Sequence, residues 1–259
     1  MAQATETPWM TTERSTRVRA AAVVASSVIA LAGCGGGGGG ALPQGSDPVD
    51  LDPAGFRTRI DNPYWPMSPG GKWVYRETDP DGNEQRVVVT VTDRSKEILG
   101  IDAVVVHDVV TEKGRLVEDT YDWYAQDADG NVWYLGEDTK EYADGRLVCA
   151  EGSWEAGVDG AQAGIVVPGR PEVGMAYRQE YYAGEAEDRA RILSLDERAE
   201  VPFGAFDGLL MTRDTTPLEP RVLEHKLFAK GVGPVLVISL SGGGGREELI
   251  RFEKGAEAG

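Results

Sequence analysis

The residues with the clearest chemical potential are carboxylates and aromatic rings gathered in one stretch, Glu118-Asp-Thr-Tyr-Asp-Trp-Tyr124. If this stretch is a β-strand, Glu118, Asp122 and Tyr124 share one face and Trp123 lies on the other, because side chains alternate along a strand. Carboxylates beside rings can bind a cation or a sugar. The competing interpretation is the solvated face of an acidic protein. These four residues are tentative ligand-binding residues.

Glu224 and His225 form a second candidate pair. A histidine changes charge near neutral pH, so His225 could be a ligand-binding or proton-responsive residue as well as a structural one. A hydrolase could draw its acid and base from Glu118, Asp122 and Glu224, although nothing in the sequence selects two of them. We therefore assign no catalytic residue, metal ligand or cofactor.

Two other motifs have simpler explanations. Asp127-Ala-Asp-Gly-Asn131 resembles the start of a calcium loop, but a helix-loop-helix site needs Gly at its sixth position and Glu at its twelfth, where this chain has Val132 and Asp138. We expect a hairpin turn instead. Ser153 lacks the glycine spacing of a nucleophile elbow and is expected to be a loop residue.

The N-terminal region carries the most specific signal in the chain. Three arginines precede the short apolar run from Ala20 to Ala30, and Leu31-Ala-Gly-Cys34 follows it. A basic region, a short hydrophobic region and a small-residue cleavage site ending in Cys are typical of a lipoprotein signal peptide. We therefore expect residues 1–33 to be removed and Cys34 to carry the lipid, with Met10 as an alternative start to Met1. This predicts localisation at the cell membrane, lipid-anchored on its extracytoplasmic face.

Charge and composition narrow the choice of partners. The chain has 26 basic and 43 acidic residues, a net charge of −17. Such a charge repels nucleic acid and anionic lipid surfaces, so the expected membrane contact is through the Cys34 lipid alone. Six glycines follow Cys34, and residues 34–52 are predicted to be a flexible tether.

The remaining residues, 53–257, are predicted to form one all-β domain of about ten strands. Valine-rich runs such as 87–91 and 104–110 alternate with polar residues, and Gly-containing turns separate them. An internal echo at an offset of 102 to 106 residues relates Trp73-Val-Tyr-Arg76 to Met175-Ala-Tyr-Arg178. We expect two similar halves, about 63–155 and 168–254, in a curved antiparallel sheet shaped like a clam or barrel, with residues 156–174 as the hinge.

Two segments have motifs that resemble those of a known group of proteins. Asn62-Pro-Tyr-Trp-Pro-Met-Ser-Pro-Gly-Gly-Lys-Trp-Val-Tyr-Arg76 has a proline-flanked apolar pair, a Gly and a Trp-x-Tyr strand, and Phe228-Ala-Lys-Gly-Val-Gly-Pro-Val235 is a closing turn. Together they resemble actinobacterial exported lipoproteins of unknown function. The resemblance implies a curved antiparallel sheet and no assigned chemistry.

These observations favour a non-enzymatic extracytoplasmic binding module. Its expected ligand is a lipid, a glycan or a partner protein of the envelope, and no nucleic acid. A carboxylate-based surface hydrolase is the alternative.

Overall fold

A computed structural model describes residues 42–150, 152–241 and 244–256. The predicted signal peptide, the lipidation site Cys34 and the first part of the predicted tether lie outside the described residues. The described residues belong to one compact unit.

The all-β fold class is confirmed. Apart from a 3-10 turn, η1 (Pro53–Gly55), every regular element in the described ranges is a strand. The strands are β1 (Phe56–Arg57), β2 (Lys72–Thr78), β3 (Glu84–Ile98), β4 (Ile101–Glu112), β5 (Arg115–Asp127), β6 (Val132–Ala143), β7 (Arg146–Cys149), β8 (Trp154–Glu155), β9 (Gln162–Val167), β10 (Ala176–Arg178), β11 (Glu180–Tyr181), β12 (Arg189–Val201), β13 (Gly204–Thr215), β14 (Leu223–Ala229), β15 (Gly233–Ser241) and β16 (Gly245–Glu253).

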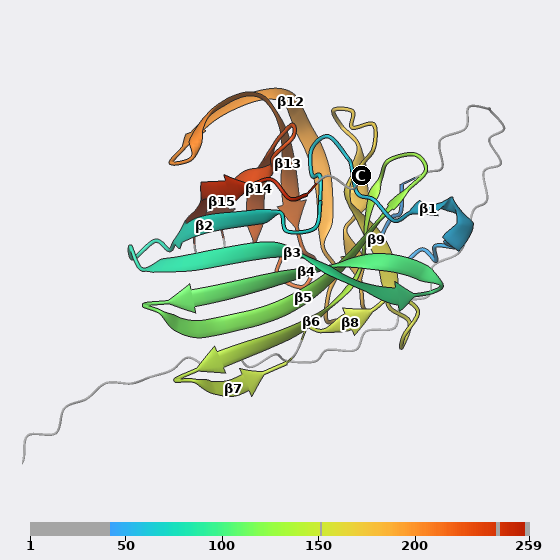
Figure 1. The fold of residues 1–259 in the computed structure, drawn as a ribbon, viewed down its shortest axis with the longest axis horizontal. Coiled ribbons are helices and arrows are strands. Elements are labelled where there is room, and N and C mark those ends of the chain that lie inside the picture. Colours follow the sequence, from blue (N-terminus) through green and yellow to red (C-terminus); the bar gives the residue numbers. More distant parts are fainter. Residues whose placement is uncertain (1–41, 151, 242–243, 257–259) are drawn as a thin grey trace, which may run out of the picture. The chain divides into compact units, whose positions relative to one another are not determined.

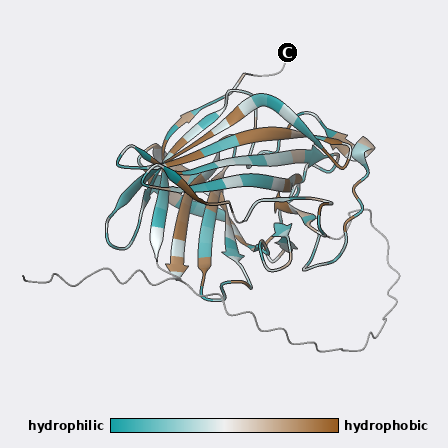
Figure 2. Cartoon of the chain, turned by 90° about the horizontal axis from the view of Figure 1, so that it is seen from below, coloured by the Kyte–Doolittle hydropathy of each residue, from teal (hydrophilic) through white to brown (hydrophobic). Residues whose placement is uncertain are grey.

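Thirteen of these strands follow one another in a single antiparallel sheet, β10-β12-β13-β14-β15-β16-β2-β3-β4-β5-β6-β9-β11. The sheet curls until it is nearly closed into a barrel (Figure 1). Two up-and-down runs, β2 to β6 and β10 to β15, lie on either side of β16, which pairs with β2. Polar and apolar residues interleave along the strands (Figure 2), as expected for a sheet with two different faces.

The two segments that carry the family resemblance contact each other. The indole of Trp73 donates to the carbonyl of Val232 at 2.8 Å, and the hydroxyl of Tyr75 donates to the carbonyl of Pro234 at 3.0 Å. Gly233 has a φ of +111°, and a Cβ there would lie 2.9 Å from Trp65. The closing turn is therefore shaped to receive the rings of the opening segment.

The two runs share a structural detail. The register shifts between Trp123 and Tyr124 where β5 pairs with β6, and between Leu227 and Phe228 where β14 pairs with β15. These bulges lie 104 residues apart, within the offset of the sequence echo. The common origin of the two halves stays a prediction.

Three expectations about segments differ from the structure. The predicted hinge 156–174 contains strand β9, whose Ile165 is 1% exposed, because the run Ile-Val-Val is apolar enough to complete the sheet. Residues 42–52 of the predicted tether lie against the domain. The buried guanidinium of Arg178 donates to the carbonyls of Gly45 and Asp47, at 2.8 Å each. The described strands number sixteen rather than about ten, since several are only two to four residues long.

Candidate functional site

Four of the six tentative ligand-binding residues face the inside of the curled sheet. Glu118 and Asp122 share a face of β5 with the buried Thr120 and Tyr124. Glu224 lies on the face of β14 that carries Lys226 and the buried Phe228. We call the carboxylates of this side the acidic inner face: Glu77, Asp108, Glu118, Asp122, Glu137, Glu180, Asp188, Asp214, Glu224 and Glu247.

The other two tentative residues point the other way. Trp123 alternates with Asp122 and Tyr124, and its ring lies under the ammonium of Lys96, 3.3 Å from nitrogen to ring centroid. His225 lies between Arg213 and Ile238 in the register of β13 to β15, on the face opposite to Lys226. The structure therefore does not bring Trp123 and His225 to the inner face, because strand alternation places them on the outer one.

Asp122 and Glu137 stand directly opposite each other on β5 and β6. Burial, reinforced by the charge of Glu118, raises the pKa of Asp122 to about 7, although the hydroxyl of Tyr134 donates to its Oδ1 at 2.7 Å. Burial and then the charges of Asp122 and Glu180 raise the pKa of Glu137 to about 9. Glu137 therefore keeps its proton at neutral pH, whereas Asp122 is only partly ionised there.

A second group of charged side chains, around Lys226, comes from the other half of the chain. The ammonium lies 3.2 Å from Asp214 Oδ2 and 4.0 Å from Glu224 Oε2. Burial alone would lower the pKa of Lys226, but the charges of Asp214, Glu224 and Asp188 outweigh it and raise that pKa. Lys226 therefore stays charged, held by carboxylates.

Glu180, on β11, connects the two groups. Burial and the charge of Asp188 raise the pKa of Glu180 to about 8. The charge of Lys226 lowers this pKa, and the charge of Asp122 raises it. The indole of Trp154 donates to its Oε2 at 3.1 Å. Carboxylates from both halves of the chain thus face one shared region.

The inner face continues to β2, β4 and β16. Burial, followed by the charge of Glu77, raises the pKa of Glu247 to about 7. Burial also raises the pKa of Asp108, with Asp122 as the next cause, and the pKa of Glu77, with Glu224 as the next cause. The acidic inner face therefore spans most of the sheet.

Aromatic rings adjoin these carboxylates. Tyr124 and Tyr134 stack with centroids 4.9 Å apart, and Trp154 meets Tyr134 edge-on at 5.3 Å. Trp65 contacts Tyr124 at 5.4 Å. Because Tyr134 and Trp154 also donate to Asp122 and Glu180, rings and carboxylates form one continuous surface.

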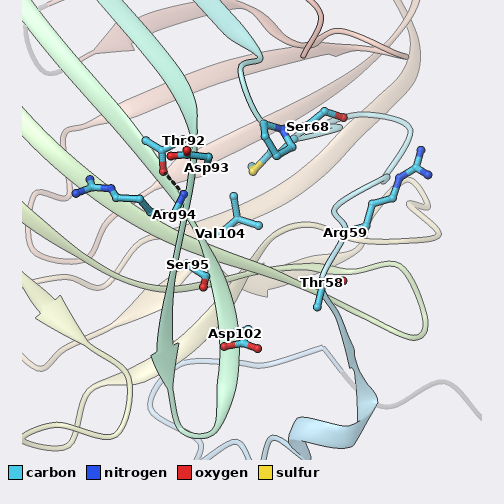
Figure 3. A pocket seen from close by; sticks show the side chains of 11 residues that line it. Thr58, Arg59, Ser68, Thr92, Asp93, Arg94, Ser95, Asp102 and Val104 are labelled. Carbon is cyan, nitrogen blue, oxygen red and sulfur yellow. Dashed lines mark hydrogen bonds between the residues drawn. The ribbon is translucent and has the colours of Figure 1, made fainter. Parts of the chain in front are cut away.

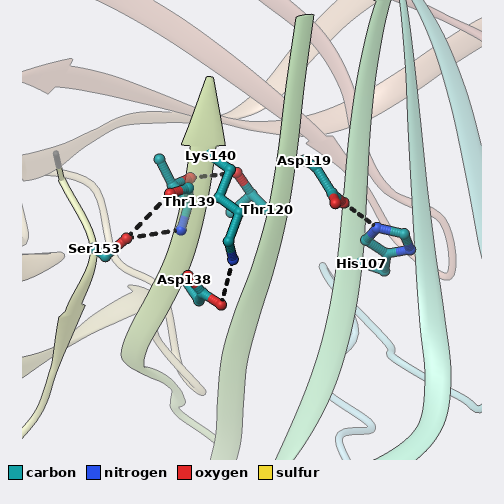
Figure 4. Close-up of polar contacts among 7 residues, drawn as sticks. All are labelled: His107, Asp119, Thr120, Asp138, Thr139, Lys140 and Ser153. Carbon is teal, nitrogen blue, oxygen red and sulfur yellow. Dashed lines mark hydrogen bonds and ion pairs between the residues drawn. The ribbon is translucent and has the colours of Figure 1, made fainter. Parts of the chain in front are cut away.

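Figure 4 shows further polar contacts along β4, β5 and β6, of which the one between His107 and Asp119 lies on the outer face. A ring nitrogen of His107 hydrogen-bonds Asp119, and the His107 ring stacks on Tyr121 at 4.3 Å. Ser153 uses its hydroxyl on the backbone of Thr139, accepting from its N–H and donating to its carbonyl. The Ser153 hydroxyl is engaged by the backbone both as donor and as acceptor, so Ser153 is not placed to act as a nucleophile.

The Asp127 segment forms the turn between β5 and β6, as predicted. Asp127 accepts from the backbone and side chain of Asn131 and from the indole of Trp133. Across the described ranges, no group of three or more His, Cys, Asp or Glu side chains is arranged to hold a metal ion. No helix in the described part of the chain is long and apolar enough to cross a membrane.

A groove of about 270 Å³ opens on the bulge of β3 beside the segment from Thr58 to Pro69. Its charged side chains do not converge. Figure 3 shows Arg59 and Arg94 extending in opposite directions, and Arg94 lies over the ring of Tyr121, 4.9 Å from its centroid. The groove therefore lacks a focused set of polar groups.

Sequence reasoning missed Glu180, Asp214 and Lys226 as members of the site; it grouped Glu137 with the carboxylates of the Glu118 stretch but did not count it among the tentative ligand-binding residues. Glu137 could have been found from the hairpin turn at Asp127, since that turn sets the register that places it opposite Asp122. The others depend on contacts across the sheet, which no local pattern reveals.

Fold and site together define a nearly closed antiparallel sheet with an acidic inner face. No family of known proteins matches the sequence, and no curated protein matches it either. One solved structure is similar, that of a protein from Parabacteroides distasonis proposed to be a lipoprotein, at 12% identity and a TM-score of 0.41. The match covers 73% of this chain and 98% of that one. At this TM-score the structural similarity is too low to indicate a shared function.

Proposed function

We propose that this chain is a lipid-anchored extracytoplasmic protein that binds a polar envelope ligand on its acidic inner face, without converting it chemically. The signal sequence, with Cys34 as the lipid-bearing residue, supports the anchoring, and the resemblance to actinobacterial exported lipoproteins agrees with it. The site would comprise Glu118, Asp122, Tyr124 and Glu224 of the tentative residues, together with Glu137, Glu180 and Asp214.

The binding role is supported by one observation: the inner face is polar and partly exposed to solvent. The side chains of Glu224 and Lys226 are 29% and 31% exposed, although their strand neighbour Phe228 is 2% exposed. A purely structural interior would be apolar, because partly desolvated carboxylates without cations cost folding free energy. Proteins retain such groups where they serve a function, so a polar ligand is favoured over a lipid tail. A glycan fits this lining of carboxylates and rings.

Native mass spectrometry of the protein purified from its own host tests the binding role. We expect a reproducible additional mass, and we expect Asp122→Asn and Glu224→Gln to reduce the ligand-bound fraction. The matched control is Glu200→Gln, because Glu200 is an exposed residue of β12 away from the inner face. A domain that is always empty, or equal occupancy in all variants, would contradict the proposal.

The hydrolase alternative rests on one specific feature, the opposed pair Asp122 and Glu137. Burial raises the pKa of Asp122 to about 7, and burial together with the charges of Asp122 and Glu180 raises the pKa of Glu137 to about 9; these values would suit a base and an acid at neutral pH. A glycosidase and esterase panel comparing the native chain with Asp122→Asn, Glu137→Gln and Glu118→Gln tests it. Hydrolysis that Asp122→Asn abolishes would support catalysis, whereas no activity on any substrate would discard it.

A further inference from the structure

Three polar side chains on the inner face, Asp108, Thr212 and Asp214, lack a hydrogen-bond partner for one atom each within the described ranges, and the last two are neighbours. Thr212 is 1% exposed and Asp214 is 4% exposed. Neither Thr212 Oγ1 nor Asp214 Oδ1 has a hydrogen-bond partner within the described ranges. Thr212 is the register partner of Lys226 and shares its face with Asp214, so both atoms belong to the region that Glu180 connects to Asp122. Asp214 Oδ1 accepts and Thr212 Oγ1 can accept, so a donor is what this region lacks.

Charge balance on the inner face points to the kind of donor. Ten carboxylates face this region, and Lys226 is the one ammonium from the described residues that lies among them. Lys226 contacts Asp214 and Glu224, which leaves Asp122, Glu137 and Glu247 without an ion pair within the described ranges. The Lys226 contacts also show that this face can hold an ammonium group in a cage of carboxylates.

The carboxylates are spread over several strands, and this spacing favours an organic cation over a metal ion. Calcium needs six to eight oxygen atoms converging on one point, and no such convergent group is formed by the described side chains. The carboxylates instead follow neighbouring strands, which lie about 4.8 Å apart. Asp122 and Glu137 occupy adjacent strands, and Glu180 and Asp214 come from the other half of the chain. A flexible molecule with several separated charges fits this spacing better than one ion does.

The aromatic rings favour the same chemistry. Tyr124, Tyr134 and Trp154 adjoin Asp122 and Glu180, and ring faces attract ammonium groups and their methylene spacers. We propose that the ligand of the acidic inner face is an organic cation with at least two ammonium groups, one at Asp122 and Glu137 and another at Asp214 and Thr212. This inference rests on the proposed binding function and specifies its ligand class.

Spermidine is a suitable probe, measured by isothermal titration calorimetry on the delipidated native chain in about 150 mM NaCl, where unspecific surface attraction is screened. We expect saturable binding, and a dissociation constant at least about tenfold weaker for the double variant Asp122→Asn with Glu137→Gln, since each lost charge-assisted contact contributes on the order of 1 kcal/mol. The control is Asp196→Asn with Glu200→Gln, which removes two exposed charges from β12 and should change the constant by less than about twofold.

Proton release gives a second measurement that does not depend on one variant. The groups that face the site are the ten carboxylates of the acidic inner face, Lys226, and the tyrosines at 75, 124 and 134. Because Asp122, Glu137 and Glu180 hold protons near neutral pH, an ammonium ligand must displace them. The heat of binding should therefore depend on the ionisation enthalpy of the buffer, and affinity should rise from pH 6 to pH 8.

Three results would overturn the inference. Mg²⁺ could bind as tightly as spermidine at equal ionic strength, or uncharged octanediol could bind as tightly as spermidine. The third is a double variant that binds spermidine as tightly as the native chain does. If spermidine fails while native mass spectrometry still finds a neutral glycan, the amine inference falls and the proposed binding function stands. If neither experiment finds a ligand, both fall.

Discussion

Replacing Glu137 by Gln should make the domain less sensitive to alkaline pH. Glu137 lies opposite Asp122, and its pKa is raised from 4.5 to about 9. A carboxyl with a raised folded-state pKa contributes stability that is complete below its unfolded pKa. This stability is lost as pH rises from the unfolded value of 4.5 towards 9. Glutamine has a similar shape and cannot ionise, so the variant removes this loss.

The magnitude follows from the two pKa values. At pH 8 the unfolded chain has released this proton and the folded chain keeps it, which costs the fold about 1.4 kcal/mol for each pH unit above 4.5, or roughly 5 kcal/mol. At pH 5 the same cost is below about 1 kcal/mol. Relaxation and water reduce such figures, so we expect the fall in unfolding free energy between pH 5 and pH 8 to shrink by about 2 to 4 kcal/mol in the variant.

Urea unfolding at pH 5, 6.5 and 8 measures this directly. The native chain should lose stability steadily across the range, and Glu137→Gln should lose clearly less. Glu200→Gln, at an exposed position of β12, should follow the native chain. A Glu137→Gln profile parallel to that of the native chain would refute the account of a Glu137 carboxyl that stays protonated in the folded state.

Three further outcomes test other parts of the molecule. Arg178→Met should cost about 3 kcal/mol of unfolding free energy and make residues 42–52 more sensitive to protease, because it leaves buried carbonyls unpaired. Gly136→Ala should cost more than about 2 kcal/mol by thermal unfolding, since a Cβ there would lie 2.2 Å from the carbonyl of Trp154. Gly55→Ala, where a Cβ meets nothing within 4 Å, should cost little. Cys34→Ser should move the protein from the membrane fraction to the soluble fraction in its host, and unchanged membrane association would contradict lipidation.

The fold class followed from the sequence because strand propensity is a local property. β3 and β4 carry runs of β-branched residues, 87–92 and 104–106, bounded by turn residues, so strand identity needed no knowledge of the partners. The short strands were missed for the opposite reason. β8 has two residues and β11 has two, too few to show any period. Their positions are set by contacts such as that of Trp154 with Glu180.

The candidate site was predictable only where it lies on one strand. Alternation along β5 correctly separates Asp122 and Tyr124 from Trp123. It cannot reveal that Lys226 and Asp214 approach from the other half, because that depends on how far the sheet curls. Nor does composition show which of 43 acidic residues face inward. Burial and mutual charge make that selection, and both are tertiary properties.

The position of β16 has a consequence for how the chain reaches this structure. The strand that joins the two up-and-down runs follows all the other described strands in sequence, and its Glu248 pairs with Arg76, 172 residues earlier. Until residues 245–253 arrive, β2 and β15 both present open edges, and contacts this distant in sequence form slowly. A chain cut before β16 would keep those edges exposed and aggregate. Pairing of β16 with β15 and β2 therefore covers both open edges at once and joins the two runs into one sheet.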